Sequence, residues 1–234
     1  MQKLRIHYFE HIFFEGPGSI EEWCKKNGHS LSSTKFYKEF TLPNISDIDW
    51  LIIMGGPMDV YDEQKFGWLA TEKKFIKQAI VAGKTVIGIC LGAQILAEIF
   101  RAKVYKNKYK EIGWFSVEWS FEATKSQLFE GIKSHVTVFH WHGDTFDLPE
   151  NAIRLASSEA CKNQAFLYNK KVLGLQFHLE TTATSLQQML ENGKSELIPE
   201  KYIQPEEEIR NHQRFIEKNK EILFILLDRL AAEG

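Results

Sequence analysis

The first hundred residues alternate between short apolar runs and segments whose apolar positions recur with helical spacing. Runs rich in branched and aromatic residues predict buried strands, whereas apolar residues at every third or fourth position predict helices. Strands are expected at 4–9, 35–40, 49–54 and 86–90, and helices at 19–27, 68–82 and 93–100. This alternation predicts a parallel, doubly wound sheet, which binds ligands at the carboxyl ends of its strands.

The pattern changes after residue 103, where helices give way to short strands separated by turns. These strands are expected at 103–105, 114–119, 136–140, 153–156, 165–168 and 172–178. We find no repeat, low-complexity tract or linker-like segment between the two halves. The sequence therefore predicts an α/β fold, in which a doubly wound, mostly parallel sheet flanked by helices continues into an antiparallel extension.

After residue 180 the pattern becomes helical again. One helix is expected at 185–191, and Pro205 with three following glutamates opens a longer one, because proline and acidic residues suit a first helical turn. Apolar residues follow one face of the longer helix: Ile209, Ile216, Leu223, Leu227 and Leu230. We expect this extension, 184–234, to pack on the rest, so that 1–234 forms a single domain. A partner-binding helix is the alternative.

Composition and charge narrow the class of protein. The chain is 44% hydrophobic and 26% charged, which is ordinary for a globular protein, and its formal net charge of -2 gives no electrostatic argument for nucleic acid or a membrane surface. The longest apolar stretch, 86–100, is too short and too polar to span a membrane. Cys24, Cys90 and Cys161 are widely spaced, which indicates neither a disulfide framework nor a metal site. We expect a cytoplasmic protein.

Cys90 ends one of the predicted strands, and a predicted helix begins immediately afterwards. Gly88 and Gly92 flank it two residues away on either side, as a tight strand-to-helix turn requires. The N-terminus of a helix favours a thiolate, so this position suits a nucleophile. A buried structural cysteine is the alternative, because free cysteines are among the most buried residues.

His178 and Glu180 are two residues apart on a predicted strand, so their side chains point to the same face. The carboxylate can then hold the imidazole in one tautomer while the imidazole takes a proton from Cys90. A histidine and glutamate with this spacing are weak grounds alone. Combined with a cysteine on a strand-to-helix turn, they predict a catalytic triad.

Two further motifs lie where the predicted sheet would place a ligand. Gly55 and Gly56, before Pro57, leave the backbone bare, so that an N–H there and the N–H of Leu91 can form an oxyanion hole. A plain turn is the alternative. The second motif is His140-Trp141-His142-Gly143-Asp144. We expect this segment to be a substrate-side loop, with a simple turn as the alternative, and we expect no metal there.

In this order, the four motifs resemble those of the class I (triad-type) glutamine amidotransferase family, over about 49–180. The likeness is strongest to the amidotransferase domain of GMP synthase and to stand-alone proteins similar to it. The resemblance implies a flavodoxin-like fold and no cofactor. It also implies that Cys90 attacks the side-chain amide of glutamine, forming a γ-glutamyl thioester and releasing ammonia, with His178 as base and Glu180 as its orienter.

The same resemblance assigns the substrate-binding residues. Gly55, Gly56 and Leu91 would surround the oxyanion, Gln94 would contact the α-amino or α-carboxylate end of glutamine, and His142, Gly143 and Asp144 would line the same pocket. The long polar segment 57–67 lies beside the expected oxyanion hole, and we expect it to be a lid that selects the leaving group.

Three functions remain open at this point. Leu179 replaces the usual proline, Leu91 replaces the aromatic residue common in GMP synthases, and no Gly-rich phosphate loop follows Glu180. The first function is hydrolysis of glutamine with transfer of ammonia to a separate synthase subunit. The second is free-standing hydrolysis of another γ-glutamyl amide. The third, a non-catalytic regulatory module, is disfavoured by the intact triad.

Overall fold

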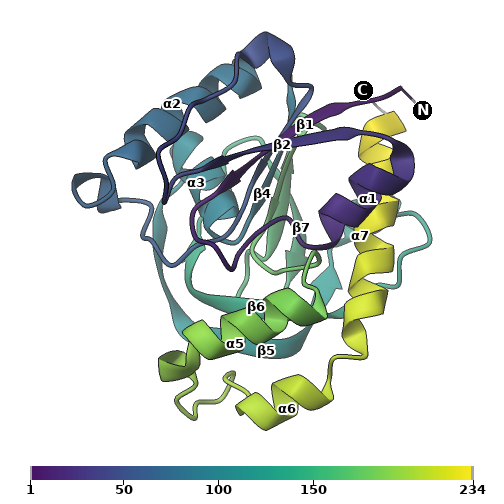
Figure 1. Cartoon of the computed structure of the whole chain (residues 1–234). Helices are drawn as coiled ribbons and strands as arrows, with labels where there is room; N and C mark the ends of the chain where they lie inside the picture. The colour runs from purple at the N-terminus through teal and green to yellow at the C-terminus, as the bar shows by residue number, and fades with distance from the viewer. Residues whose placement is uncertain (1, 233–234) are drawn as a thin grey trace.

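The computed structural model describes residues 2–232 and contains a nine-stranded sheet with strand order β2-β1-β3-β4-β9-β8-β7-β5-β6. Five strands run parallel, because helical crossovers return the chain to the same edge. They are β1 (Arg5–Glu10), β2 (Ser30–Lys35), β3 (Trp50–Ile53), β4 (Thr85–Ile89) and β9 (Val172–Leu175). The predicted doubly wound, mostly parallel sheet is therefore confirmed (Figure 1).

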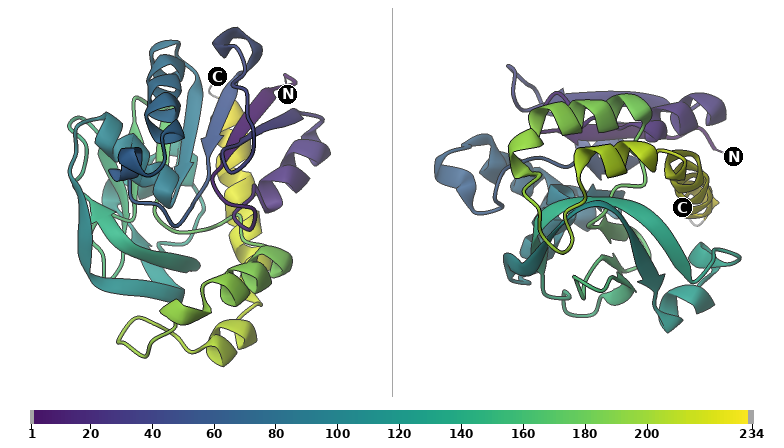
Figure 2. Two further views of the ribbon diagram at one scale, coloured as in Figure 1. Left: turned by 60° about the vertical axis from the view of Figure 1, so that its left-hand side comes forward. Right: turned by 90° about the horizontal axis from the view of Figure 1, so that it is seen from below.

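The other strands form the predicted antiparallel extension. They are β5 (Val104–Trp119), β6 (His135–Phe146), β7 (Ile153–Ser157) and β8 (Ala165–Tyr168). Strands β5 and β6 form a long, curved pair, with an irregularity between Lys106 and Glu111 (Figure 2). The two short strands predicted at 103–105 and 114–119 are the two ends of the single strand β5.

Helices cover both faces of the sheet. They are α1 (Ser19–Asn27), α2 (Trp68–Val81), α3 (Leu91–Ile99), α4 (Phe121–Lys125), α5 (Ala183–Asn192), α6 (Glu206–Asn211) and α7 (Phe215–Ala232). Alternate residues of the parallel strands enter two hydrophobic clusters, one beneath α1 and α7 and the other beneath α2 and α3. A third cluster lies between the β5–β6 pair and the helices α5 and α6. None of the described helices is long and apolar enough to cross a bilayer.

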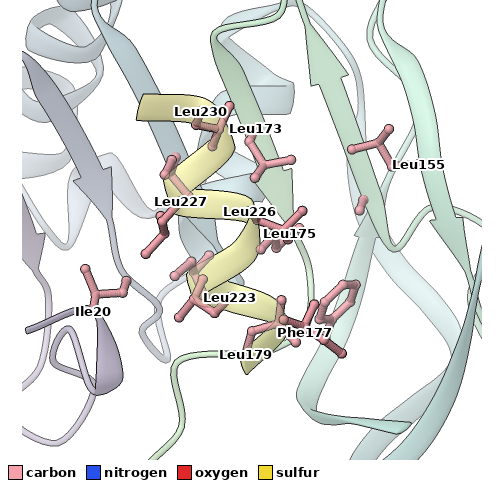
Figure 3. Packing of buried hydrophobic residues seen from close by; sticks show 14 of the residues in the cluster. Ile20, Leu155, Leu173, Leu175, Phe177, Leu179, Leu223, Leu226, Leu227 and Leu230 are labelled. Carbon is pink, nitrogen blue, oxygen red and sulfur yellow. The ribbon is translucent and has the colours of Figure 1, made fainter. Parts of the chain in front are cut away.

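The C-terminal helices pack on the rest of the described chain, and the single domain expected over 1–234 stays a prediction. Leu223, Leu227 and Leu230 of α7 lie in the cluster that also contains Leu173 and Leu175 of β9 (Figure 3). The prediction of a single long helix after Pro205 is wrong, because a turn separates α6 from α7. The apolar stripe is buried nonetheless: Ile209 and Ile216 enter the third cluster.

The second strand is displaced from its prediction. It runs over Ser30–Lys35 rather than 35–40, and it pairs only with β1 at the edge of the sheet. An edge strand needs little apolar surface, so this polar segment has no strand pattern in the sequence. The apolar residues that suggested a strand, Phe36 and Phe40, instead pack in a turn, where the Phe36 ring stacks on Trp68 at 4.8 Å between centroids.

Two boundaries near the expected site also differ. Strand β9 ends at Leu175, so His178 lies beyond it and joins β6 by a single bridge to Phe139. The segment from His140 to Asp144, expected as a loop or turn, lies within β6 and pairs with β5. Strand β5 is long, although the sequence pattern divided it into two strands. Pairing with β5 extends β6 through this segment.

Candidate active site

Cys90 lies between β4 and α3 with a backbone φ of 52°. A Cβ at Gly88 would approach the Gly92 carbonyl to 2.5 Å, and a Cβ at Gly92 would overlap the carbonyl oxygen of Ile53. Both glycines are therefore needed for α3 to begin so close to β3 and β4. This is the strand-to-helix turn that the sequence predicts.

The Cys90 thiol is 6% exposed, and its sulfur lies 3.6 Å from the carbonyl oxygen of Trp141. Burial raises the pKa of this thiol, whereas the neighbouring His178 imidazole lowers it. The negative charge of Glu15 raises the pKa further, and the backbone N–H of Leu91 lowers it. The net shift is upward, so the thiol keeps its proton at rest and needs a base to become a nucleophile.

His178 is the base nearest to that thiol. Its Nδ1 lies 2.7 Å from Oε1 of Glu180, and both side chains are buried. Burial lowers the pKa of the His178 imidazole, but the charge of Glu180 and the neighbouring Cys90 thiol raise it well above its ordinary value. Within residues 2–232, the buried Nε2 atom has no hydrogen-bond partner, which leaves it free to take a proton. The imidazole is thus oriented to accept a proton from the thiol.

Backbone hydrogen bonds from two other elements hold this pair in place. The N–H of His178 donates to the carbonyl of Phe139 in β6 at 2.8 Å, and the N–H of Ser19 in α1 donates to the carbonyl of Glu180 at 2.9 Å. Both side chains were expected on a regular strand, and this prediction is wrong. Their proximity comes instead from a short segment fixed between β6 and α1.

Gly55 and Gly56 follow β3 and lie beside the start of α3. A Cβ at Gly56 would come within 3.2 Å of the Leu91 side chain and 3.0 Å of His11. The buried His11 imidazole contacts the carbonyl of Gly55 at 2.9 Å and a carboxylate oxygen of Glu72 at 2.8 Å. This contact fixes the glycine turn next to Leu91, where our prediction of an oxyanion hole requires it.

A cavity of about 720 Å³ opens onto Cys90. Five of the predicted substrate-binding residues line it: Gly56, Gln94, His142, Gly143 and Asp144. Gly55 and Leu91 lie beside the cavity without lining it. Within the lining, Gln94 is held by its amide, which donates to the side-chain oxygen of Gln176 at 3.2 Å.

Several charged and aromatic residues of the cavity wall were missed by the sequence analysis. They are Phe13, Phe14, Glu15, Lys106, Lys110 and Glu196. They come from the segment after β1, from the β5–β6 pair and from the segment after α5. Only the segment after β1 could have been identified from the sequence, because it follows the carboxyl end of a strand of the parallel sheet. Trp141, which also lines the cavity, belongs to the segment 140–144 that was expected on the substrate side.

The predicted lid, 57–67, contains one turn of 3-10 helix, Asp62–Gln64. Only Pro57 and Met58 of this segment line the cavity. The Lys73 ammonium of α2 binds Glu63 at 2.7 Å and the carbonyl of Val60 at 2.8 Å. The segment is therefore attached to α2, and its role as a lid stays a prediction.

A buried cluster of Glu111, His140 and His142 lies behind the cavity wall, with donor atoms within 4.8 Å of one another. Burial raises the pKa of Glu111, but the two imidazoles and a hydrogen bond from Ser158 lower it to about 2. Gln164 also donates to this carboxylate, at 2.6 Å. These are the residues of 2–232 that could hold a metal ion, and our expectation that the protein uses none stays a prediction.

His140 should make stability depend on pH. Its ring is fully buried without a hydrogen bond, and burial lowers its pKa to about 4. An unfolded chain binds a proton at this site near pH 6.5, so stability falls as the pH drops from there toward 4. Between these two pH values, the free energy of unfolding measured with urea should fall by roughly 2–3 kcal/mol less in His140→Leu than in the wild type. His135→Leu, at an exposed position of the same strand, should keep the wild-type slope. Equal slopes in all three proteins would contradict this assignment.

Comparison with known proteins relates the chain to one family. The model of the family "Glutamine amidotransferase class-I" matches residues 18–196. The glutamine amidotransferase-like protein YfeJ of Salmonella typhimurium is 32% identical over 236 residues, which cover 97% of each chain. A glutamine-hydrolyzing GMP synthase subunit from Archaeoglobus fulgidus is 35% identical over 153 residues, covering 63% of this chain and 75% of that protein.

Solved structures agree with the sequence comparison. A glutamine amidotransferase from Thermotoga maritima superposes with a TM-score of 0.87 at 32% identity, over 98% of this chain and 99% of that one. A glutamine amidotransferase from Methylobacillus flagellatus superposes with a TM-score of 0.91 at 26% identity, over 99% of this chain and 95% of that one. The chain therefore belongs to the class I glutamine amidotransferase family.

Proposed function

We propose that this protein hydrolyses the side-chain amide of L-glutamine through a γ-glutamyl thioester on Cys90. The observation that carries the proposal is the arrangement of Cys90, His178 and Glu180. A buried thiol at the N-terminus of α3 lies beside an imidazole, whose far nitrogen is 2.7 Å from a buried carboxylate. Nucleophile, base and orienter in this order form a working triad.

The first half of the reaction forms the thioester. His178 takes the proton of Cys90, and the sulfur attacks the γ-carbonyl carbon of glutamine. The resulting oxyanion faces the N–H groups of Gly56 and Leu91, each of which typically lowers the barrier by about 3–4 kcal/mol. His178 then gives its proton to the amide nitrogen, the C–N bond breaks, and ammonia leaves.

The second half of the reaction releases glutamate. Water attacks the thioester carbon while His178 takes its proton, and the same proton returns to the sulfur as the C–S bond breaks. Glu180 stabilises the imidazolium in both halves of the reaction. Gln94 and Asp144 line the same cavity, and in this proposal they bind the α-amino and α-carboxylate end of the substrate.

Replacement of Glu180 by glutamine tests the role assigned to the carboxylate. Removal of the negative charge 2.7 Å from the imidazole should lower the pKa of His178, so it takes the thiol proton less readily. We expect kcat to fall by roughly 10²-fold, and less than in His178→Ala. Steady-state kinetics against pH should show the acid limb of the profile moved to lower pH, because that limb reports loss of the imidazolium proton, which gives the neutral base. An unchanged profile would contradict this role.

Two functions that use this hydrolysis have support. One is transfer of ammonia to a separate synthase, since the similar protein of Archaeoglobus fulgidus is named as a subunit of GMP synthase. The other is free-standing hydrolysis of a larger γ-glutamyl amide, which is favoured by the size of the cavity. Pockets of roughly 300–1,000 Å³ hold drug-sized ligands, so about 720 Å³ exceeds what glutamine needs.

Hydrolysis of L-glutamine by the purified chain, measured beside a panel of γ-glutamyl amides and dipeptides with Cys90→Ala as the blank, separates these outcomes. Activity confined to glutamine supports the amidotransferase role. Brisk turnover of a γ-glutamyl dipeptide with little on glutamine supports the free-standing hydrolase. Absence of turnover on every substrate would contradict the proposed function and favour a regulatory module.

A further inference from the structure

Glu15 is a cavity-lining carboxylate that the triad chemistry does not use. It follows β1, and its side chain lies directly over Gly55, where a Cβ would overlap its Oε2 atom. The same Cβ position is 3.3 Å from Cε1 of the His178 ring. The Glu15 carboxylate and the edge of the catalytic imidazole therefore both lie against Gly55.

The leaving amine departs beside this imidazole. In the proposed reaction, His178 donates its proton to the amide nitrogen as the C–N bond breaks, so the departing amine lies next to the imidazole. Whatever that amine carries beyond its nitrogen comes within reach of Glu15. A carboxylate at this point selects among leaving groups and not among glutamyl groups.

Glu15 is partly buried and lines the cavity. Within residues 2–232, no side chain forms an ion pair or hydrogen bond with it. Glu196 on the same wall differs, because it accepts from Lys110 at 2.9 Å and from Trp141 at 3.2 Å. Burial raises the pKa of Glu15 to about 6, with His178 opposing and Glu180 adding to the rise. The group is still ionised above neutral pH, and a cation beside it would stabilise that charge.

Aromatic rings near Glu15 suit an organic cation. Phe13 and Phe14 precede it in the cavity wall, and Trp141 lines the same cavity. The wall also contains Lys106 and Lys110, of which Lys110 is paired with Glu196 at 2.9 Å. Faces of aromatic rings attract ammonium groups, and a neighbouring carboxylate adds a direct ion pair. The volume of about 720 Å³ leaves space for a leaving group larger than ammonia.

We propose that Glu15 and the adjacent aromatic residues form a binding site for a cationic leaving amine, so that the preferred substrate is a γ-glutamyl amide of a diamine or polyamine. This inference rests on the proposed function and deepens it by naming the substrate class. The products are glutamate and the free amine, and the step is the same hydrolysis of a C–N bond through the Cys90 thioester.

The test compares three γ-glutamyl amides of matched length together with glutamine. Their leaving groups are an alkyl diamine, the corresponding monoamine and the corresponding ω-amino acid, which are cationic, neutral and anionic beyond the scissile nitrogen. We expect kcat/KM for the diamine amide to exceed that of the monoamine amide by about tenfold or more, and the anionic amide to be poorest. Preference for the neutral or the anionic amide would overturn the inference.

Glu15→Gln and Glu196→Gln form the matched pair of variants. The ratio of kcat/KM for the diamine and monoamine amides should collapse toward one in Glu15→Gln, and should persist in Glu196→Gln, where the carboxylate is already paired. An unchanged ratio in Glu15→Gln would overturn the inference. Turnover of glutamine that depends on Cys90, without any preference for the cation, defeats this inference alone. Absence of Cys90-dependent turnover on all four amides defeats the proposed function as well.

Discussion

Turnover of γ-glutamyl amides is expected to fall by roughly 10⁴-fold or more in Cys90→Ala. The sulfur is the atom that attacks the substrate in this account, and an alanine methyl group provides no nucleophile. The loss should be confined to kcat, because the cavity wall that binds the substrate is otherwise unchanged. Steady-state assays of ammonia release, with circular dichroism to verify the fold, measure the effect.

Cys24→Ala is the matched control for this prediction. Cys24 is also buried, 2% exposed, but it lies on the buried face of α1 in the hydrophobic core and does not line the cavity. Burial raises the pKa of its thiol to about 12, so it is not a reactive group. Turnover should survive in this variant. Full activity in Cys90→Ala would exclude the proposed mechanism.

Gly92→Ala is expected to cause a large loss of stability close to the site. The new Cβ would overlap the carbonyl oxygen of Ile53 and lie 2.8 Å from its carbonyl carbon. These are backbone atoms of a central strand, so the start of α3 has to move away from β3. We expect a loss of about 2–4 kcal/mol in the free energy of unfolding, measured with urea.

The same displacement should impair catalysis, because Leu91 and Cys90 move with the helix. Gly67→Ala is the control, since Gly67 has a φ of -59° and no atom within 4 Å of its Cβ position. This variant should unfold at the wild-type midpoint or slightly above it. A Gly92→Ala protein as stable and active as the wild type would show that α3 does not need the close approach to β3.

The sequence predicts the central strands and helices well because their patterns are dictated by burial on both faces. Strand β3 is fully apolar, and α1 ends at Gly28, whose φ of 69° is the left-handed conformation that a helix end favours. The edge strand β2 has no such pattern, since Leu31 is the one apolar residue among its six and few of them are buried. Its displacement by five residues follows from that difference.

The residues of the candidate site also differ in how well the sequence predicts them. Cys90, His178 and Glu180 are found from short motifs, because their spacing along the chain already implies the turn and the pairing. Glu15 and Glu111 are not, since each becomes meaningful only when a distant residue is brought against it. The partners of Glu111 lie on β6 and before β8, and Glu15 meets His178 across more than half the length of the chain.

The most direct test of the central claim is to trap the acyl-enzyme. The wild-type protein is mixed with L-glutamine, or with whichever γ-glutamyl amide it turns over fastest, quenched in acid and analysed by intact-protein mass spectrometry and peptide mapping. The account predicts one γ-glutamyl group per chain, bound to the peptide that contains Cys90 and absent from Cys90→Ala. Continued turnover with the acyl group on another residue, or with no acyl group on any, would contradict it.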